Sequence, residues 1–486
     1  MKILFKGHDF KYETEATVKL FISGRFEFLF DETDADGDFV SSQIRKGKKY
    51  TYLFAVCSLN GKYARKSLKI ANEDADEKNC EHEICRLIYL CLGKLTGINP
   101  PWGLLTGIRP VRKMTELIEK GYDKADCFNL LKTRYMTSER RLELAYKTAE
   151  NQIPLLKTAD SDSISIYISI PFCPTRCSYC SFVSHSLDSA RKLIPDYIRC
   201  LCREIEILGR IVRDMNFKID TVYFGGGTPT SIDAVQLDTL MKTLAENIDI
   251  SKVREYNVEA GRADTITYDK LSVIKKNGAG RISVNPQTLN DKVLENIGRM
   301  HTAQDTVNAY KMARELGFDN INMDLIAGLP GDTYESFADT LDRVMELDPE
   351  SITVHTLTIK RSASLYGEDN SRLFAQSMTA DMVNRSMDIL PENGWHPYYL
   401  YRQKNTLENL ENIGFAKKGA ESLYNIFIMD ETQIILGAGC AASTKLIEPN
   451  GKITRIHNYK FPYEYINRFD ELMKKKELIY KIYGEK

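Results

Sequence analysis

Residues 164–185 read ISIYISIPFCPTRCSYCSFVSH, an apolar run with the composition of a β-strand followed by a loop with three cysteines. Cys173, Cys177 and Cys180 have the spacing C-x3-C-x2-C, and the residues between them are polar or turn-forming. A single free cysteine usually packs as a small hydrophobe, whereas three thiols grouped in a polar loop indicate metal binding. We therefore expect this loop to hold a metal ion or a metal cluster.

Two kinds of metal centre are compatible with three thiols. Structural zinc takes four ligands in a closed tetrahedron, so three cysteines without an obvious fourth ligand leave its shell incomplete. Iron–sulfur clusters are held by cysteine thiolates, usually four, and three would leave one iron free to bind a substrate or cofactor. In both cases the coordination shell has an open position, which indicates a chemical site.

Composition narrows the class of protein. The chain has 486 residues and 43% hydrophobic composition, enough for a large core and about three domains. Its formal net charge of −1 gives no support for nucleic-acid or membrane-surface binding, and no apolar run approaches the roughly 18 residues of a membrane span. The first residues, MKILFKGHDFKYE, are interrupted by lysines, so we expect no signal peptide. Eleven cysteines then indicate a reducing, cytoplasmic location without structural disulfides.

The first part of the chain has its own rhythm. Residues 1 to about 70 alternate apolar and polar, and Asn60-Gly61 separates two strand-like runs, which predicts a small antiparallel sheet with a hairpin. From Glu77 the apolar period becomes helical and places Cys91 in the core. A polar linker follows at 157–163. The expected domains are an N-terminal α+β accessory domain (1–156), a partial barrel (163–362) and a C-terminal α+β substrate-cap domain (363–486).

Beyond the linker, strand-like runs alternate with amphipathic segments of helix length. The runs cover 164–170, 220–224, 255–260, 281–285, 320–327 and 351–357. Repeated β-then-α units predict a parallel sheet with helices outside. Because a TIM barrel needs about eight such units to close, we predict an α/β fold with an open, partial (β/α)6 TIM-like barrel.

Unusual residues gather at the carboxyl ends of these runs, the edge where catalytic loops converge in α/β barrels. After the cysteines come GGGTPT at 225–230, Glu259, Asn285 with Gln287, Asp324 and His355. The glycines allow the backbone to approach a polar ligand closely. Glu259 ends an apolar strand, where a carboxylate needs a partner that a cationic ligand would supply. Asp324 either contacts a ligand or pairs with a nearby Lys or Arg, and His355 is more typical of a hydrogen-bonded core histidine.

The motifs resemble a known family. CPTRCSYC is similar to the CxxxCxxC signature of radical S-adenosylmethionine (SAM) enzymes. YISIPFC, GGGTPT, VEA, RISVNPQ, IGRMHT and NMDLIAGLPGDT resemble, in order, the blocks of the oxygen-independent coproporphyrinogen III oxidase-like branch. PPWGLLTGIRP and YLYRQKN are most similar to HemZ-type coproporphyrinogen dehydrogenases, which extends the resemblance over most of the chain.

The resemblance implies two cofactors, a [4Fe-4S] cluster and one or two molecules of SAM. Cys173, Cys177 and Cys180 would bind three irons, and SAM would chelate the fourth through its amine and carboxylate. One-electron reduction would cleave SAM to methionine and a 5′-deoxyadenosyl radical. The implied SAM-binding residues are Tyr167, Tyr179, Gly225, Gly226 and Glu259, with Gly227, Thr228, Gln287, Arg299 and Asp324 for a second SAM.

The implied reaction belongs to haem biosynthesis. Two propionate side chains of coproporphyrinogen III would lose hydrogen and CO2 and become the vinyl groups of protoporphyrinogen IX. The implied partners are this tetrapyrrole substrate and a low-potential electron donor of the flavodoxin or ferredoxin class, with no nucleic acid and no membrane span. Tyr398, Tyr399, Tyr401, Arg402 and Lys404, with Lys360 and Arg361, either line the substrate site or form a solvated strand with extended cations.

Two departures leave other functions open. The oxidase pattern has a fourth cysteine, not a cluster ligand, where this chain has Phe182, and a phenylalanine there is typical of HemW-type haem chaperones. Those chaperones usually carry an HNxxYW-like stretch, but the corresponding residues 421–427 read ESLYNIF. The alternatives are a haem chaperone and a radical SAM enzyme that acts on another substrate.

Overall fold

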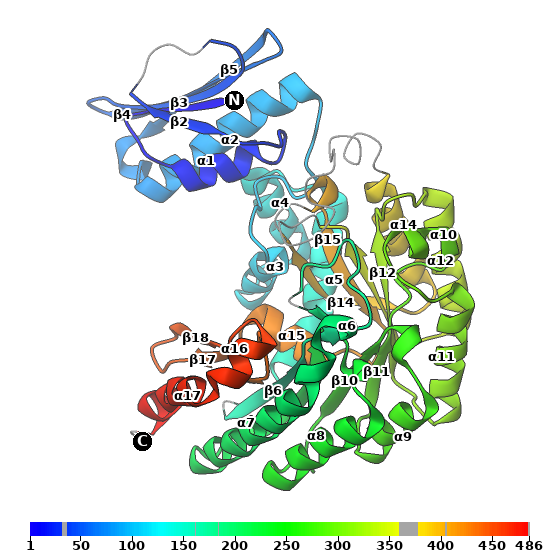
Figure 1. Ribbon diagram of the computed structural model, residues 1–486. Helices are drawn as coiled ribbons and strands as arrows, with labels where there is room; N and C mark the ends of the chain where they lie inside the picture. The colour runs from blue at the N-terminus through cyan, green and yellow to red at the C-terminus, as the bar shows by residue number, and fades with distance from the viewer. Residues whose placement is uncertain (32–35, 161, 183, 359–377, 404–405, 485–486) are drawn as a thin grey trace. The chain divides into compact units, whose positions relative to one another are not determined.

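The computed structural model describes residues 1–31, 36–160, 162–182, 184–358, 378–403 and 406–484 (Figure 1). The chain divides into two compact units, Met1–Tyr146 and Lys147–Lys486. Lys360, Arg361 and Lys404, which were predicted near the substrate, lie outside the described residues. The expected three-part division stays a prediction.

The first unit is built on a mixed sheet. Its elements are β1 (Lys2–Lys6), α1 (Lys11–Val18), β2 (Glu27–Phe30), β3 (Phe39–Lys46), β4 (Tyr50–Leu59), β5 (Lys62–Ala71), α2 (Glu77–Thr96), α3 (Pro110–Glu119), α4 (Lys124–Tyr135) and α5 (Glu139–Leu156), within which the division falls. The strand order is β2-β1-β3-β4-β5, and β1 pairs in parallel with both neighbours. The prediction of a purely antiparallel sheet is therefore wrong, because α1 serves as a crossover that lets β2 run parallel to β1.

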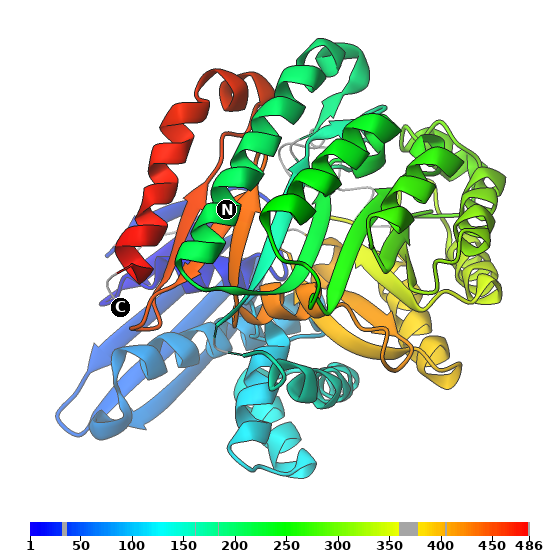
Figure 2. The same cartoon turned by 90° about the horizontal axis from the view of Figure 1, so that it is seen from below.

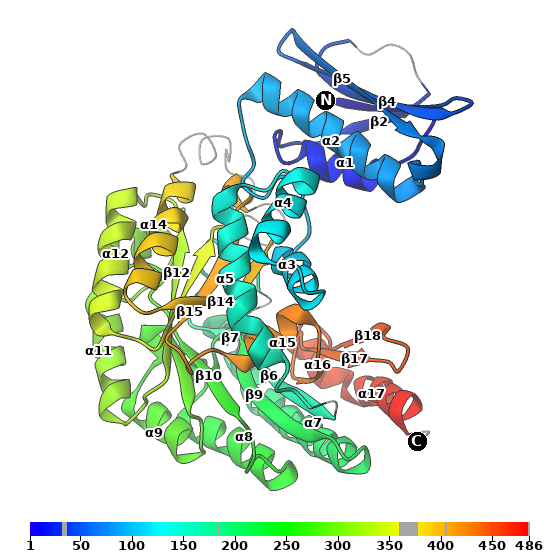
Figure 3. The ribbon, with the colours of Figure 1, turned by 180° about the vertical axis from the view of Figure 1, so that it is seen from behind.

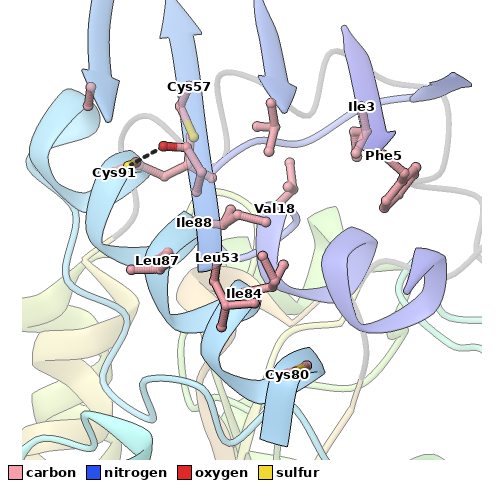
Figure 4. Packing of buried hydrophobic residues seen from close by; sticks show 14 residues of the cluster. Ile3, Phe5, Val18, Leu53, Cys57, Cys80, Ile84, Leu87, Ile88 and Cys91 are labelled. Atoms are coloured by element: carbon pink, nitrogen blue, oxygen red, sulfur yellow. Dashed lines mark hydrogen bonds between the residues drawn. The ribbon is translucent and has the colours of Figure 1, made fainter. Parts of the chain in front are cut away.

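The predicted hairpin and helix of this unit are confirmed. Asn60 and Gly61 join β4 to β5 with φ of 50° and 73°, the left-handed conformation that a two-residue hairpin turn requires. Helix α2 is capped by Asp76, which accepts from the backbone N–H of Asn79. Figure 4 shows its apolar side packed against the sheet, with the fully buried Cys91 3.8 Å from the carbonyl oxygen of Ala55.

The second unit contains the predicted barrel. Its helices are α6 (Leu187–Ala190), α7 (Ile194–Asp214), α8 (Ala234–Asn247), α9 (Tyr268–Lys276), α10 (Asp291–Asn296), α11 (Ala303–Glu315), α12 (Tyr334–Leu347), α14 (Thr379–Glu392), α15 (Leu423–Asp430), α16 (Pro462–Asn467) and α17 (Phe469–Tyr483). Its strands are β6 (Ser163–Ile170), β7 (Phe172–Cys173), β8 (His185–Ser186), β9 (Lys218–Gly226), β10 (Glu255–Gly261), β11 (Arg281–Val284), β12 (Ile321–Ala327), β13 (Ser351–Thr356), β14 (His396–Arg402), β15 (Glu411–Ala416), β16 (Ile434–Ala438), β17 (Ser443–Ile447) and β18 (Ile453–His457).

The sheet of this unit has eleven strands in the order β14-β15-β13-β12-β11-β10-β9-β6-β16-β17-β18. Strands β6 and β9 to β13 are parallel neighbours in chain order, which confirms the predicted (β/α)6 core. Strand β16 adds a further parallel strand beside β6, and β15 pairs antiparallel with β13. The two end strands of the sheet, β14 and β18, do not pair with each other in the described residues, so the barrel is open.

The two faces of the sheet differ in chemistry. On β6 the isoleucines at 164, 166, 168 and 170 are fully buried, whereas Ser165, Tyr167 and Ser169 alternate with them. The isoleucine face lies under the helices, which Figure 2 shows along the outside of the curved sheet. Strand register aligns Tyr167 with Tyr223 and Tyr223 with Asn257, so the opposite face, called the inner face below, is polar. Because successive side chains of a strand point to opposite faces, the isoleucines lie on one face and the polar residues on the other.

The C-terminal helix α17 is tied to the barrel by a buried ion pair. Lys476 Nζ lies 2.8 Å from Glu204 Oε1 of α7, and the two side chains are 1% and 0% exposed. Lys476 also donates to the carbonyl of Gly437 at 2.6 Å, and Glu204 accepts from Tyr465 and Asn458. These bonds compensate the desolvation of both charges. In the part of the chain that the structure describes, no helix combines the length and the apolar character of a membrane span.

Replacing Lys476 by methionine leaves Glu204 charged and unpaired in the core. We expect Lys476→Met to lower the free energy of unfolding by about 3–5 kcal/mol, measured by urea denaturation followed by circular dichroism. The matched control is Lys218→Met, because Lys218 and its partner Asp160 are 64% and 70% exposed, and there we expect a change below about 1 kcal/mol. Equal effects of the two variants would contradict the role assigned to the buried pair.

Candidate active site

The candidate site lies at the carboxyl edge of the parallel strands, where the cysteine loop meets the glycine turn after β9. Gly227 donates its backbone N–H to Ile170 O at 2.8 Å, and Thr228 donates to Phe172 O at 2.8 Å. A Cβ atom on Gly227 would lie 2.7 Å from Phe172 O and 3.0 Å from Cys173 Sγ. Gly226 has φ of 111°, which side chains strongly disfavour. The glycines therefore allow the two loops to pack backbone against backbone.

The three cysteines are held in one short loop. Cys173 and Cys177 are 8% and 7% exposed, and Cys180 is half-buried. Thr228 Oγ1 lies 3.4 Å from Cys173 Sγ, and the backbone N–H of Cys180 donates to Cys177 O at 3.1 Å. The loop is also pinned to the turn after α10, because Thr175 donates to Gly298 O at 2.9 Å. Its thiols therefore have fixed positions.

The thiols need a positive centre to ionise. Burial raises the pKa of Cys180 to about 11, with the other two cysteines among the charges that add to the effect, and burial also raises the pKa of Cys173. Coordination to a metal deprotonates a thiol outright. Within the described ranges no three His, Cys, Asp or Glu side chains stand close enough to hold one metal ion. The C-x3-C-x2-C loop supplies three thiols, which fits a cluster that keeps one iron open better than a closed, four-ligand zinc site.

Glu259 ends β10 on the inner face, in contact with tyrosines. Tyr223 donates its hydroxyl to Glu259 Oε1, and its ring stacks on Tyr424 of α15 at 4.4 Å and on Tyr167 at 6.1 Å. A Cβ on Gly225 would lie 3.1 Å from Glu259 Oε2 and 3.2 Å from the Tyr167 ring. Burial raises the pKa of Glu259 to about 7, and the nearby Asp324 contributes to this rise. A cation bound beside this carboxylate would stabilise its charged form.

Gln287 follows β11, and Arg299 lies in the loop after α10. Gln287 has φ of 66°, a strained conformation for a non-glycine residue, held because it bridges to β12: its N–H donates to Asp324 O at 2.8 Å. Arg299 donates to Asn285 O at 2.6 Å and to the Tyr179 hydroxyl at 3.3 Å. Although burial lowers it, the pKa of Arg299 is raised by the nearby Tyr179 and Cys177. Arg299 therefore places a fixed positive charge beside the cysteine loop.

Asp324 has a partner that the sequence did not indicate. His355 Nε2 lies 3.7 Å from Asp324 Oδ2, Asn322 donates to Oδ1 at 2.7 Å, and Tyr401 of β14 lies 3.4 Å from His355 Nδ1. Burial raises the pKa of Asp324, but its contacts with His355 and Asn322 outweigh this and hold the pKa below its usual value. The expected alternative partner, a Lys or Arg, is thus replaced by a histidine that itself faces the site.

On the inner face and in the loop after α10, several buried polar atoms have no hydrogen-bond partner among the described residues. They are Asn257 Oδ1, Ser283 Oγ, Asn285 Oδ1, Gln287 Oε1 and Arg299 Nε. Buried polar groups are normally satisfied, so a group of orphans on neighbouring strands indicates a polar ligand. SAM, which carries an ammonium, a carboxylate, a ribose and an adenine, offers matching donors and acceptors. The residues present therefore fit both a cluster at the thiols and SAM beside it.

The structure brings the three cysteines and the predicted SAM-binding residues to this edge, but sequence reasoning missed several neighbours. Tyr223 shares a face with Gly225 by alternation, a signal that was available, and Arg262 follows Glu259 by three residues. Tyr424 carried no local signal. Tyr398 and Tyr399 are 1% and 6% exposed and belong to a hydrophobic cluster with Phe427. Tyr399 and Tyr401 lie on one face of β14, with their rings stacked 6.0 Å apart, and Tyr401 lies 3.4 Å from His355 Nδ1. A place for these tyrosines beside the substrate stays a prediction. Figure 3 shows β14 next to β15.

Comparison with known proteins agrees with this geometry. Residues 167–344 match the model of the Radical SAM superfamily. The chain is 39% identical to the oxygen-independent coproporphyrinogen-III oxidase-like protein HemZ of Bacillus subtilis, over 83% of this chain and 82% of the relative. It is 33% identical to the heme chaperone HemW of Bacillus subtilis, over 57% of this chain and 69% of the relative.

One solved structure shares the fold. Coproporphyrinogen III oxidase (HemN) from Escherichia coli superposes with a TM-score of 0.51 and 24% identity, over 66% of this chain and 72% of that one. At this identity the likeness shows a common fold. The chain therefore belongs to the radical SAM superfamily and, within it, to the oxygen-independent coproporphyrinogen III oxidase-like family that includes HemZ.

Proposed function

We propose that this protein is a coproporphyrinogen III dehydrogenase that forms protoporphyrinogen IX without oxygen. For each of two propionate side chains, one hydrogen atom leaves the carbon next to the ring, the bond to the carboxylate breaks, CO2 departs and one electron passes to an acceptor. The observation that carries the proposal is the match to HemZ over most of both chains, together with the buried thiols and orphaned polar atoms at one barrel edge.

The cofactors follow from the family. As a radical SAM protein, the chain uses a [4Fe-4S] cluster and SAM. When bound, they supply a 5′-deoxyadenosyl radical that removes a hydrogen atom from the substrate. The protein's part is to bind, orient and exclude water. In this proposal Cys173, Cys177 and Cys180 hold three irons, and the iron left free accepts the amine and carboxylate of SAM.

The proposed SAM contacts divide by charge. Glu259, with the Tyr223 hydroxyl on its other side, accepts from the SAM ammonium. Gly225 and Gly226 leave room for the amine and carboxylate end of SAM. Tyr167 and Tyr179 lie at the sides of the site. A second SAM, or part of the substrate, would use Gly227, Thr228, Gln287, Arg299 and Asp324. Of these, Gln287 and Arg299 retain unpartnered buried atoms, which supports their engagement by a ligand.

A haem chaperone is the second candidate function, and one observation favours it. Phe182 stands where the oxidase pattern has a fourth cysteine, and its side chain is 68% exposed. An exposed phenylalanine beside the proposed cluster suits contact with a flat apolar ring such as a porphyrin. The same ring can belong to a substrate or to carried haem, so only turnover separates the two.

The deciding assay combines reductant, SAM and coproporphyrinogen III with reconstituted enzyme under strictly anaerobic conditions. We expect 5′-deoxyadenosine and protoporphyrinogen IX to form together, measured by chromatography and by porphyrin fluorescence after oxidation. 5′-Deoxyadenosine without a porphyrin product would indicate a different substrate. Stable stoichiometric haem binding without turnover would indicate a chaperone.

The cluster assignment predicts a loss of iron when one ligand is removed. Cys177→Ala should abolish uptake of iron and sulfide and the visible absorption of the reconstituted protein. The matched control is Cys202→Ala, because Cys202 is a half-buried cysteine of α7 whose sulfur accepts a hydrogen bond from Thr243. This variant should take up iron and sulfide like the wild type. Wild-type protein that takes up no iron and sulfide would refute the cluster itself.

The role of Glu259 predicts a pH-dependent affinity for SAM. Because the pKa of Glu259 is raised to about 7, the carboxylate gains a proton as the pH falls through this value and loses its attraction for an ammonium. SAM affinity, measured by calorimetry on reconstituted protein, should therefore fall from about pH 8 to about pH 6.

Glu259→Gln should bind SAM about tenfold or more weakly at high pH, as expected for a lost charge-assisted hydrogen bond, and should show no such fall. Glu255→Gln is the control, because Glu255 stands on the same strand but is engaged by Ser422 and Leu423. An unchanged affinity in Glu259→Gln would remove Glu259 from the SAM site.

A further inference from the structure

Arg262 reaches from the end of β10 into the cysteine loop. Its Nη1 lies 3.6 Å from the sulfur of Cys177, within the range of a hydrogen bond to sulfur. The residue is 3% exposed. The same Nη1 donates to the carbonyl and the hydroxyl of Thr175, each at 3.0 Å. A permanent positive charge is therefore directed at one of the three thiols, away from solvent.

The guanidinium has little freedom to turn away. Asp264 accepts a two-pronged contact, from Nε at 2.9 Å and from Nη2 at 2.6 Å. Behind Asp264, His301 Nδ1 lies 3.5 Å from Oδ1, with its side chain 1% exposed. Bidentate pairs of this kind fix orientation as well as charge. The contacts from His301 to Asp264 and from Asp264 to Arg262 thus hold the guanidinium in place beside the sulfur of Cys177.

The three sulfurs are not equivalent in this respect. Cys173 faces the neutral hydroxyl of Thr228 at 3.4 Å, and a backbone N–H of Phe182 interacts with Cys180. Cys177 faces the guanidinium of Arg262 at 3.6 Å, and Arg299 also interacts with this cysteine. Adding an electron to an iron–sulfur cluster increases the negative charge on its sulfur ligands, so a cation at one ligand stabilises the reduced form more than the oxidised form.

We propose that Arg262 is a positioning residue whose charged hydrogen bond to Cys177 makes the one-electron reduction of the cluster easier. The inference rests on the proposed ligation of the cluster by Cys173, Cys177 and Cys180. It deepens that proposal, because it identifies a residue that contributes to how strong a reductant the electron donor must be. A purely structural role, in which Arg262 only ties down the loop through Thr175, is the alternative.

The two roles separate in a redox titration. Wild-type protein, Arg262→Met and Thr175→Ala are reconstituted anaerobically, their iron and sulfide are counted, and the midpoint potential is read from the electron paramagnetic resonance signal of the reduced cluster. We expect a loaded Arg262→Met cluster whose reduction is about tenfold less favourable, a shift of about 59 mV to more negative potential for a one-electron couple. Thr175→Ala, which removes only a loop hydroxyl, should keep the wild-type midpoint.

Arg314→Met is the matched control. Arg314 is also partly buried and paired, with Glu350 at 2.9 Å, but it stands on α11 and contacts Phe318 and Asp348 instead of the cysteine loop. This variant should load fully and keep the wild-type midpoint. A shift as large as that of Arg262→Met would attribute the effect to general destabilisation and overturn the inference.

The outcomes distinguish this inference from the function on which it rests. If wild-type protein takes up no cluster, the ligand assignment fails. If Arg262→Met holds a full cluster at an unchanged midpoint, Arg262 has no such role and the ligand assignment stands. If Arg262→Met does not load, Arg262→Gln decides, because it removes the charge and keeps a side chain that can donate a hydrogen bond to the loop. We then expect a loaded cluster with a lowered midpoint, whereas no loading or a wild-type midpoint would leave Arg262 with a structural role alone.

Discussion

The contact between the cysteine loop and the glycine turn after β9 is the constraint on which the site depends. Two backbone hydrogen bonds join the segments, and a single Cβ atom at Gly227 would collide with Phe172 and Cys173. Only glycine, which has no side chain, allows the two backbone segments to approach this closely. The parallel pairing of β6 with β9 brings the two loops to the same edge, so strand register and turn composition act together to place the three thiols.

The inner face of the sheet keeps charge inside a folded core. Arg281 donates to Ser351, Ser351 donates to Asn322, and Asn322 donates to Asp324. This series, with His355, keeps Asp324 ionised, whereas burial moves the pKa of Glu259 to about 7. Two carboxylates of one sheet, on β10 and β12, therefore present different charge states near neutral pH. Two carboxylates with different pKa values allow one site to bind groups that differ in charge or protonation.

Segments beyond the barrel core complete the site. Tyr424 of α15 stacks on Tyr223, and Tyr401 of β14 contacts His355. Helix α15 is itself anchored inside the sheet, because Glu255 accepts from Ser422 and Leu423 at its start. The C-terminal part of the chain thus adds aromatic surface to the inner face as well as strands to the edge of the sheet.

The sequence by itself determined the six parallel strands, the cysteine loop and the polar residues at the strand ends, because alternation and turn composition are local and parallel strands share one edge. Only the tertiary structure decided which side chains contact one another across that edge. Arg262 faces Cys177, His355 pairs with Asp324, and Tyr424 stacks on Tyr223. These contacts join residues far apart in the chain, and no local pattern encodes them. The burial of Tyr398 and Tyr399 shows the same limit, because it depends on what packs against their strand.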